Sequence, residues 1–221
     1  MKKFFRALAF IFFIPLFYTF VAETFLFIFA HFAGMWANGF IYGVIVYVAL
    51  YAMLLWSKIT FLEVLEHELI HTVVAYLFFR KVLHLEADWR RGGYVEFIGR
   101  LNTVILLAPY CLPLFTLPLL AIKPFMASST HPFLDFFMGL TWAFHVVALL
   151  IEFSPRQTDI ARIGLKSAFL IVFVVNCIFA VITLGFALNQ YAHVGAYFKE
   201  AFLRGWKIYV WAYAKAFSAT L

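Results

Sequence analysis

Long runs of apolar residues, separated by short polar breaks, constrain the fold of this chain more than any other feature. The runs cover residues 4–32, 38–56, 60–79, 101–122, 133–153 and 165–188. Each approaches or exceeds the roughly 20 residues that a helix needs to cross the hydrocarbon layer of a bilayer. Because backbone polar groups must be satisfied within such a layer, helices are favoured for these runs. The pattern predicts an all-α polytopic membrane protein with about six transmembrane helices.

The composition agrees with a membrane location. Hydrophobic residues make up 66% of the 221 residues and charged residues only 13%, against about half and about a quarter in soluble domains. The net charge of +6 favours contact with anionic lipid headgroups, and no nucleic-acid motif accompanies it. We therefore expect a multi-pass protein of a bacterial or archaeal cell membrane, with the bilayer and no nucleic acid as its partner.

Two of the runs have special features. The first starts with Lys2 and Lys3, as a signal sequence does, but no small-x-small cleavage pattern follows it, so we expect an uncleaved first span. The run at 101–122 carries Pro109, Pro113 and Pro118. A regular helix does not tolerate this spacing easily, so we expect kinks or a re-entrant segment there.

A β-hairpin is predicted between the third and fourth runs. Residues 82–89 and 94–98 alternate at about period two around a turn that contains glycine, which is typical of two short antiparallel strands. The hairpin is either purely structural, or it offers an edge that pairs with an extended peptide. In the second case the substrate-binding residues would be Tyr94, Val95, Glu96 and Phe97.

The tail at 189–221 differs from the apolar runs. Its basic residues gather toward one side of a helix and its aromatic residues toward the other, which favours an amphipathic helix in the membrane interface, or packing along the flank of the bundle. We therefore divide the chain into a transmembrane domain at 1–188, whose core at about 60–188 carries the residues described next, and a C-terminal interfacial helix at 189–221.

An HExxH motif lies in the third run. On a helix, His67 and His71 are one turn apart, so both imidazoles project from one face and can bind one metal ion. Glu68 lies beside them, where its carboxylate can accept a proton from water at the metal. Ionisable groups in an apolar segment are costly, which favours a functional role.

A catalytic zinc site usually has three protein ligands, so a third ligand must come from elsewhere. We favour Asp159, which lies at a break between two apolar runs. Glu152 and His145 are the alternatives, because both are ionisable and fall within a run; His145 could also hydrogen-bond a ligand or the substrate. An Asp159 ligand requires its loop to reach the level of the motif in the membrane.

Two further polar residues have a structural and a functional interpretation. Glu63 either completes a capping box at the start of the third helix, or contacts His67 and orients its ring without binding the metal itself. Asn102 either caps the fourth segment or donates a hydrogen bond to a reacting carbonyl.

Taken together, these features resemble the site-2 protease family of intramembrane zinc metalloproteases. The resemblance covers residues 60–188 and rests on HExxH in an apolar helix, a Gly-Gly hairpin soon after it, and an aspartate in a later broken segment. It implies Zn²⁺ bound by His67, His71 and Asp159, and Glu68 as the base. It also implies that the strand at 94–98 receives the unwound substrate.

The chain departs from the family pattern in three respects. Ile70 replaces the usual glycine before the second histidine, Asp159 follows Ser154-Pro155-Arg156-Gln157-Thr158 instead of the family's Asn-Pro and Leu-Asp-Gly pattern, and a PDZ-like domain does not fit in this length. The resemblance is therefore to a divergent, minimal member.

The expected function is that of an intramembrane zinc metalloendopeptidase that hydrolyses peptide bonds in or near transmembrane segments of other proteins. One alternative is a membrane zinc enzyme that acts on small or lipidated peptides. Another is a non-catalytic protein, either a pseudoprotease that binds membrane segments or a metal carrier. The clustering of ionisable residues at one locus argues for a fixed site, and the intact Glu68 argues for catalysis. The oligomeric state stays open.

Overall fold

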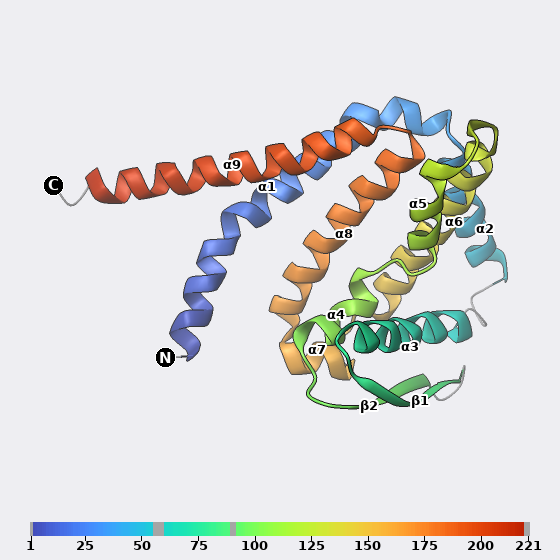
Figure 1. The fold of residues 1–221 in the computed structure, drawn as a ribbon, viewed down its shortest axis with the longest axis horizontal. Coiled ribbons are helices and arrows are strands. Elements are labelled where there is room, and N and C mark those ends of the chain that lie inside the picture. The colour runs from blue at the N-terminus through green and yellow to red at the C-terminus, as the bar shows by residue number, and fades with distance from the viewer. Residues whose placement is uncertain (1, 55–59, 89–91, 219–221) are drawn as a thin grey trace.

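A computed structural model of the chain describes residues 2–54, 60–88 and 92–218. The described residues form helices and one small sheet (Figure 1). In chain order the main elements are α1 (Lys2–Trp36), α2 (Gly39–Leu54), α3 (Thr60–Leu77), β1 (Lys81–Asp88), β2 (Gly92–Ile98), α4 (Thr103–Cys111), α5 (Thr116–Ile122), α6 (His131–Glu152), α7 (Thr158–Ile163), α8 (Leu165–Ala187) and α9 (Tyr191–Ser218).

Three described helices are long and apolar enough to cross a membrane. They cover Phe13–Trp36, Ser128–Glu152 and Leu165–Ala187. A fourth crossing is formed if α4 and α5, which are bent by 79° at their junction, count as one broken span. The described residues therefore contain three or four candidate spans, and the six spans that the sequence predicts are not shown.

The bend between α4 and α5 lies where the prolines predicted a break. Pro113 follows the end of α4 and has no N–H to donate to a preceding carbonyl, so the helix cannot continue regularly through it. The chain resumes as α5 at Thr116. The expected kink in this run is confirmed.

The largest core joins the apolar helices α1, α2, α5, α6, α8 and α9. Its centre includes Phe40, Met138 and Val181, each at most 5% exposed. Glycines allow α2 and α6 to approach closely, since a Cβ on Gly43 or Gly139 would meet a backbone carbonyl of the other helix. Small residues serve this purpose in membrane helix pairs.

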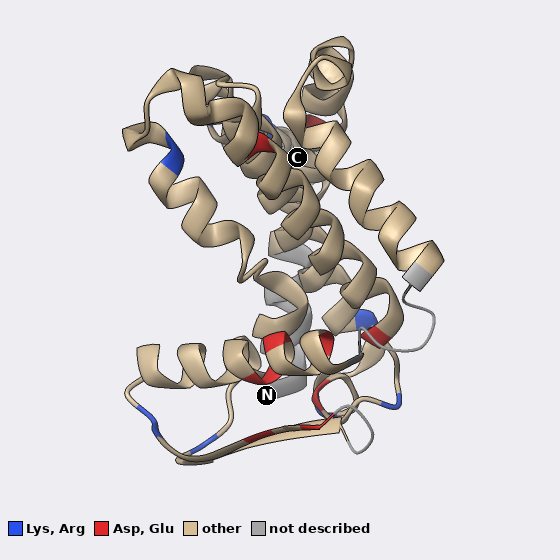
Figure 2. Cartoon of the chain, turned by 90° about the vertical axis from the view of Figure 1, so that its right-hand side faces the viewer, with Lys and Arg blue, Asp and Glu red and all other residues tan. Residues whose placement is uncertain are grey.

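The helix with the HExxH motif is not one of the candidate spans. It lies across the lower end of the bundle in both views, with the hairpin beneath it (Figures 1 and 2). With 18 residues α3 has about the length of a span, but it does not pass as a candidate span by length and apolar character together. The physical reason is that Glu63, Glu66 and Glu68 occupy its first half, and carboxylates are costly in hydrocarbon.

The hairpin is confirmed. Strands β1 and β2 pair antiparallel, from Lys81 opposite Ile98 to Asp88 opposite Gly92, with an irregularity between Val82 and His84. The turn residues at 89–91, which include part of the predicted turn, lie outside the described residues.

Helix α4 lies between α3 on one side and α7 with α8 on the other. Ile70 and Val74 of α3 pack on Ile105 and Ala108 of α4. The opposite face of α4 packs on Ile160 of α7 and on α8. This arrangement fixes the distance between the motif helix and the segment that carries Asp159.

Helix α9 packs along α1 through its first half. Tyr197 and Ala201 are buried there, and Arg204 forms an ion pair of 2.8 Å with Glu23. Further along, Trp206 and Trp211 are exposed. The tail is therefore a helix with one packed and one exposed face in its first half; its placement in the membrane interface stays a prediction.

Candidate metal centre

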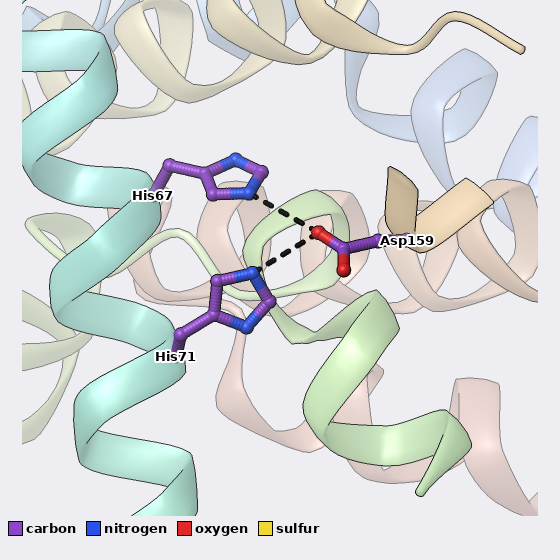
Figure 3. Close-up of side chains that lie close together, drawn as sticks. All are labelled: His67, His71 and Asp159. Carbon is purple, nitrogen blue, oxygen red and sulfur yellow. Dashed lines mark hydrogen bonds and ion pairs between the residues drawn. The ribbon is translucent and has the colours of Figure 1, made fainter. Parts of the chain in front are cut away.

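Three side chains from two distant elements converge beside α4. His67 and His71 project from one face of α3, and Asp159 reaches them from α7 (Figure 3). The Asp159 Oδ2 atom lies 3.2 Å from Nε2 of His71 and 3.6 Å from Nε2 of His67. All three ligating atoms are within 4.8 Å of one another. Among the described residues this is the one cluster of His, Cys, Asp or Glu with such a spacing.

A backbone carbonyl fixes the tautomer of His71. Its Nδ1–H donates to the carbonyl oxygen of Ile105 at 2.9 Å. In a regular helix this carbonyl would accept from the N–H of residue 109, but that residue is Pro109 and has no N–H. The proline therefore leaves the Ile105 carbonyl free for His71.

A carboxylate fixes the tautomer of His67 in the same way. The His67 Nδ1–H donates to Glu152 Oε2 at 2.9 Å, and Tyr110 packs edge-on against the ring. Glu152 thus contacts the nitrogen that points away from Asp159. Glu152 therefore contacts the candidate ligand His67. It is not part of the cluster formed by His67, His71 and Asp159.

These contacts bear on whether a metal fits. With both Nδ1 atoms donating, each Nε2 either carries a proton and donates to the Asp159 carboxylate, or, in the neutral ring, presents a lone pair that a metal ion can accept. Ligands 2.0–2.2 Å from a tetrahedral zinc are about 3.3–3.6 Å apart. The separations of 3.2 and 3.6 Å are close to this range, and two imidazoles with one carboxylate are a donor set that could hold a metal ion such as Zn²⁺.

The electrostatics of the site keep Asp159 ionised. Burial on its own would raise the pKa of Asp159, but the interactions with His67 and His71 outweigh burial and hold the pKa below its usual range. The pKa of Glu68 is raised, because burial outweighs the favourable charges of His67 and His71. A carboxylate with a raised pKa is a stronger proton acceptor, as a general base requires.

A second group of acids lies behind His67. Glu63, Glu66, Glu152 and His145 line a cavity of about 10 Å³, which has space for about one water molecule. Glu63 and Glu66 are 5% and 4% exposed, and neither Oε1 has a hydrogen-bond partner among the described residues. Burial raises the pKa of Glu63 to about 7, helped by the charge of Glu152, and that of Glu66 to about 8.

The structure places His145 outside the ligand cluster. Its Nε2 lies 3.0 Å from Oδ1 of Asn176, whose amide nitrogen donates to two backbone carbonyls. The Asn176 oxygen is therefore the acceptor, and His145 donates to it. This pairing holds the ring between α6 and α8.

The predicted substrate strand lies beside Glu68. A Cβ on Gly93 would be 2.5 Å from Cγ of Glu68 and 2.8 Å from Cγ1 of Val64, so this glycine is what allows β2 to approach the motif helix. Tyr94 and Glu96 are exposed, whereas Val95 and Phe97 are partly buried on the face toward the helices. The side chains of Tyr94 and Glu96 are therefore more accessible to a substrate than those of Val95 and Phe97.

Asn102 has a structural contact. Its Oδ1 accepts the backbone N–H of Ile105 at 2.7 Å and caps α4. The cap holds the same residue whose carbonyl binds His71, so Asn102 supports the site through the backbone. Glu63 lines the cavity behind His67; the residues just before α3 lie outside the described part of the chain, so its capping box stays a prediction.

Sequence reasoning missed the carbonyl of Ile105, the amide of Asn176 and the ring of Tyr110. One signal for the first was present: Pro109 leaves the carbonyl four residues earlier without a helical partner. Nothing local pointed to the others, because they come from α4 and α8. Comparison with known families, characterised proteins and solved structures found no match to this chain.

Proposed function

We propose that this chain is a membrane zinc metalloendopeptidase that hydrolyses peptide bonds in or near transmembrane segments of other proteins. The observation that carries the proposal is the convergence of the His67 and His71 Nε2 atoms on the Asp159 carboxylate, with the Nδ1 atom of each ring held by another group. The apolar helices long enough to span a bilayer support the membrane location.

The roles of the residues follow from their positions. His67, His71 and Asp159 would hold the metal, and bound zinc would supply an acidified water and a polarised carbonyl. Glu68, buried next to both histidines, accepts the proton of the attacking water and returns it to the leaving amine. Glu152 and the Ile105 carbonyl keep the two rings oriented.

The first test is the metal content of the detergent-purified protein by mass spectrometry. We expect about one zinc per chain, lost in Asp159→Asn and kept in Glu86→Gln, a matched change at an exposed acid. Zinc retained in Asp159→Asn would contradict the ligand set. No zinc in the wild type after supply of the ion would contradict the metalloenzyme.

The second test separates catalysis from binding. Glu68→Gln should keep its zinc and lose at least about 100-fold in peptide cleavage, since it removes the base and no ligand. The substrate is a synthetic single-pass peptide in vesicles of phosphatidylcholine and phosphatidylglycerol. Zinc binding without cleavage by the wild type would instead favour a binding protein or a carrier.

A further inference from the structure

We infer that the metal centre lies at one membrane–water boundary and that its substrates are extended segments just outside a transmembrane helix. The location rests on the arrangement of the elements and on the charged side chains that they expose, and it does not depend on the proposed activity. The substrate class also rests on the proposed peptide hydrolysis, and the tests below keep the two apart.

The contact of His67 with α6 sets the level of the site along the spanning helices. His67 is bonded to Glu152, the last residue of α6. Near the other end of α6, Asp135 forms a buried ion pair with Lys123. These two acids are 17 residues apart, or about 25 Å at 1.5 Å per residue, which is close to the thickness of the hydrocarbon layer. The site is therefore level with one end of the span.

Exposed cationic side chains lie near Asp159 in the sequence. Helix α7 connects the C-terminal end of α6 to the N-terminal end of α8, so it belongs to a connection between spans. Arg156, Arg162 and Lys166 are exposed in and beside it, and the rest of α8 carries no charged residue. Cationic side chains at the end of a span are typical of the headgroup level.

Helix α3 and the hairpin lie together at the lower end of the bundle and carry charged residues. In Figure 2 the acidic residues gather on α3 and on the hairpin below it, while most of the bundle above is free of charge. On the hairpin, Lys81, His84, Glu86 and Glu96 are exposed. Exposed charges on both strands place this layer in headgroups or water.

The packing of the hairpin on α3 indicates the side from which a substrate reaches the base. Glu68 faces the hairpin, because Gly93 of β2 lies against its Cγ. The base is thus on the side of the metal ligands that faces away from the bundle. A peptide bond at the middle of a bilayer is about 15 Å from either boundary, whereas a segment that leaves the membrane beside the hairpin is level with Glu68.

The location is tested by labelling single cysteines with a membrane-impermeant maleimide in intact cells and after permeabilisation. The positions are Phe61 and Phe79 at the two ends of α3, and Phe125 and Arg156 on either side of α6, all exposed. The wild type, with Cys111 and Cys177, measures the background. We expect positions 61, 79 and 156 to label from the same side and position 125 from the other.

The matched pair around α6 shows that the assay resolves a crossing. If positions 61 and 79 label from opposite sides while 125 and 156 also differ, α3 spans the membrane and the inference is overturned. If 125 and 156 label from the same side, α6 does not span, which also overturns it. Neither outcome depends on zinc or on activity.

The substrate class is tested with two synthetic peptides in the same vesicles. Both have an apolar span of about 20 residues, and a glycine- and serine-rich segment lies either just outside the span or at its centre. We expect zinc-loaded protein to cut the first at least about 10-fold faster, with the cut mapped to the segment by mass spectrometry. Faster cutting at the centre overturns the substrate class; no cutting of either peptide overturns the proposed function and leaves the labelling result standing.

Discussion

At the scale of single residues, the two histidines differ in the group that accepts the hydrogen bond from their Nδ1–H. His71 donates to a neutral carbonyl and His67 to a carboxylate. A charged acceptor raises the basicity of an imidazole ligand more than a neutral one does, and it fixes the ring orientation as well. The orientation of the His67 ring therefore depends on the side chain of Glu152, which a substitution can change. The orientation of the His71 ring depends on the backbone carbonyl of Ile105, which a substitution leaves in place.

Replacing Glu152 by glutamine tests this dependence. The amide oxygen can still accept from His67, but the negative charge is lost. We expect zinc affinity to fall by about 10-fold or more, measured by competition with a zinc-chelating dye. The control is Glu200→Gln, at a half-exposed acid on α9, which should bind zinc like the wild type; equal affinity in Glu152→Gln would contradict the role.

Glu63 makes stability depend on pH. Its pKa is raised by burial to about 7 in the folded chain, against about 4.3 when unfolded. The folded state thus favours the protonated form, so the cost of ionisation is absent below about pH 4.3, grows up to about pH 7, and is constant above it.

Glu63→Gln removes this cost. We expect the metal-free variant to gain roughly 1–3 kcal/mol over the wild type as the pH rises from about 4.5 to 7.5. Thermal unfolding in detergent at several pH values measures it, with Glu86→Gln as the exposed control. A stability difference that does not change with pH would contradict the assignment.

At the scale of elements, α4 is the part that brings the site together. It packs on α3 through Ile105 and on α7 through Leu107 and Tyr110, and its interior proline frees the carbonyl that binds His71. A proline in a helix interior costs about 3 kcal/mol or more. The helix therefore gives up local stability where the site needs an acceptor.

Pro109→Ala separates these two effects. The new N–H competes with His71 for the Ile105 carbonyl, so zinc affinity should fall several-fold, while thermal stability stays the same or rises because a helix-breaking residue is gone. Dye competition and thermal unfolding measure the two quantities on one sample. Pro118→Ala, in another helix, is the control for loss of a proline; unchanged zinc affinity in Pro109→Ala would rule out the role of the freed carbonyl.

At the scale of the whole molecule, the largest core and the metal centre are separate. The core that joins α1, α2, α5, α6, α8 and α9 contains none of the three candidate ligands. The ligands instead tie α3 to α7 at the lower end of the bundle. Metal binding should therefore stabilise this end of the bundle, while the remaining helices should stay folded without the metal.

Removing zinc with a chelator tests this separation. We expect the midpoint of thermal unfolding to fall by several degrees, because a ligand that binds only the folded state stabilises it by mass action, and to recover when zinc is added back. Helical circular dichroism below the transition should stay within about 10% of its starting value, since the core lies elsewhere. The Asp159→Asn variant should show no shift; loss of most helical signal on chelation would refute the separation.

Local patterns determined the elements and the chemistry of the candidate ligands. The length of the apolar runs placed the apolar helices and alternation at period two placed the hairpin. The prolines placed the break between α4 and α5, and the spacing of His67 and His71 put both rings on one face. These features depend on residues a few positions apart, so they can be seen without the fold. Asp159 was a choice among three, because no local rule says which distant carboxylate approaches a helix.

Only the tertiary structure decided how these elements lie. It placed α3 across the end of the bundle, gave Glu152 to His67 and the Ile105 carbonyl to His71, and paired His145 with Asn176 on α8. Each of these contacts joins segments at least 30 residues apart, and packing between whole helices selects among them. The sequence by itself determined which groups are able to bind a metal; the packing of α3, α4 and α7 decided which of them meet, and at which end of the bundle.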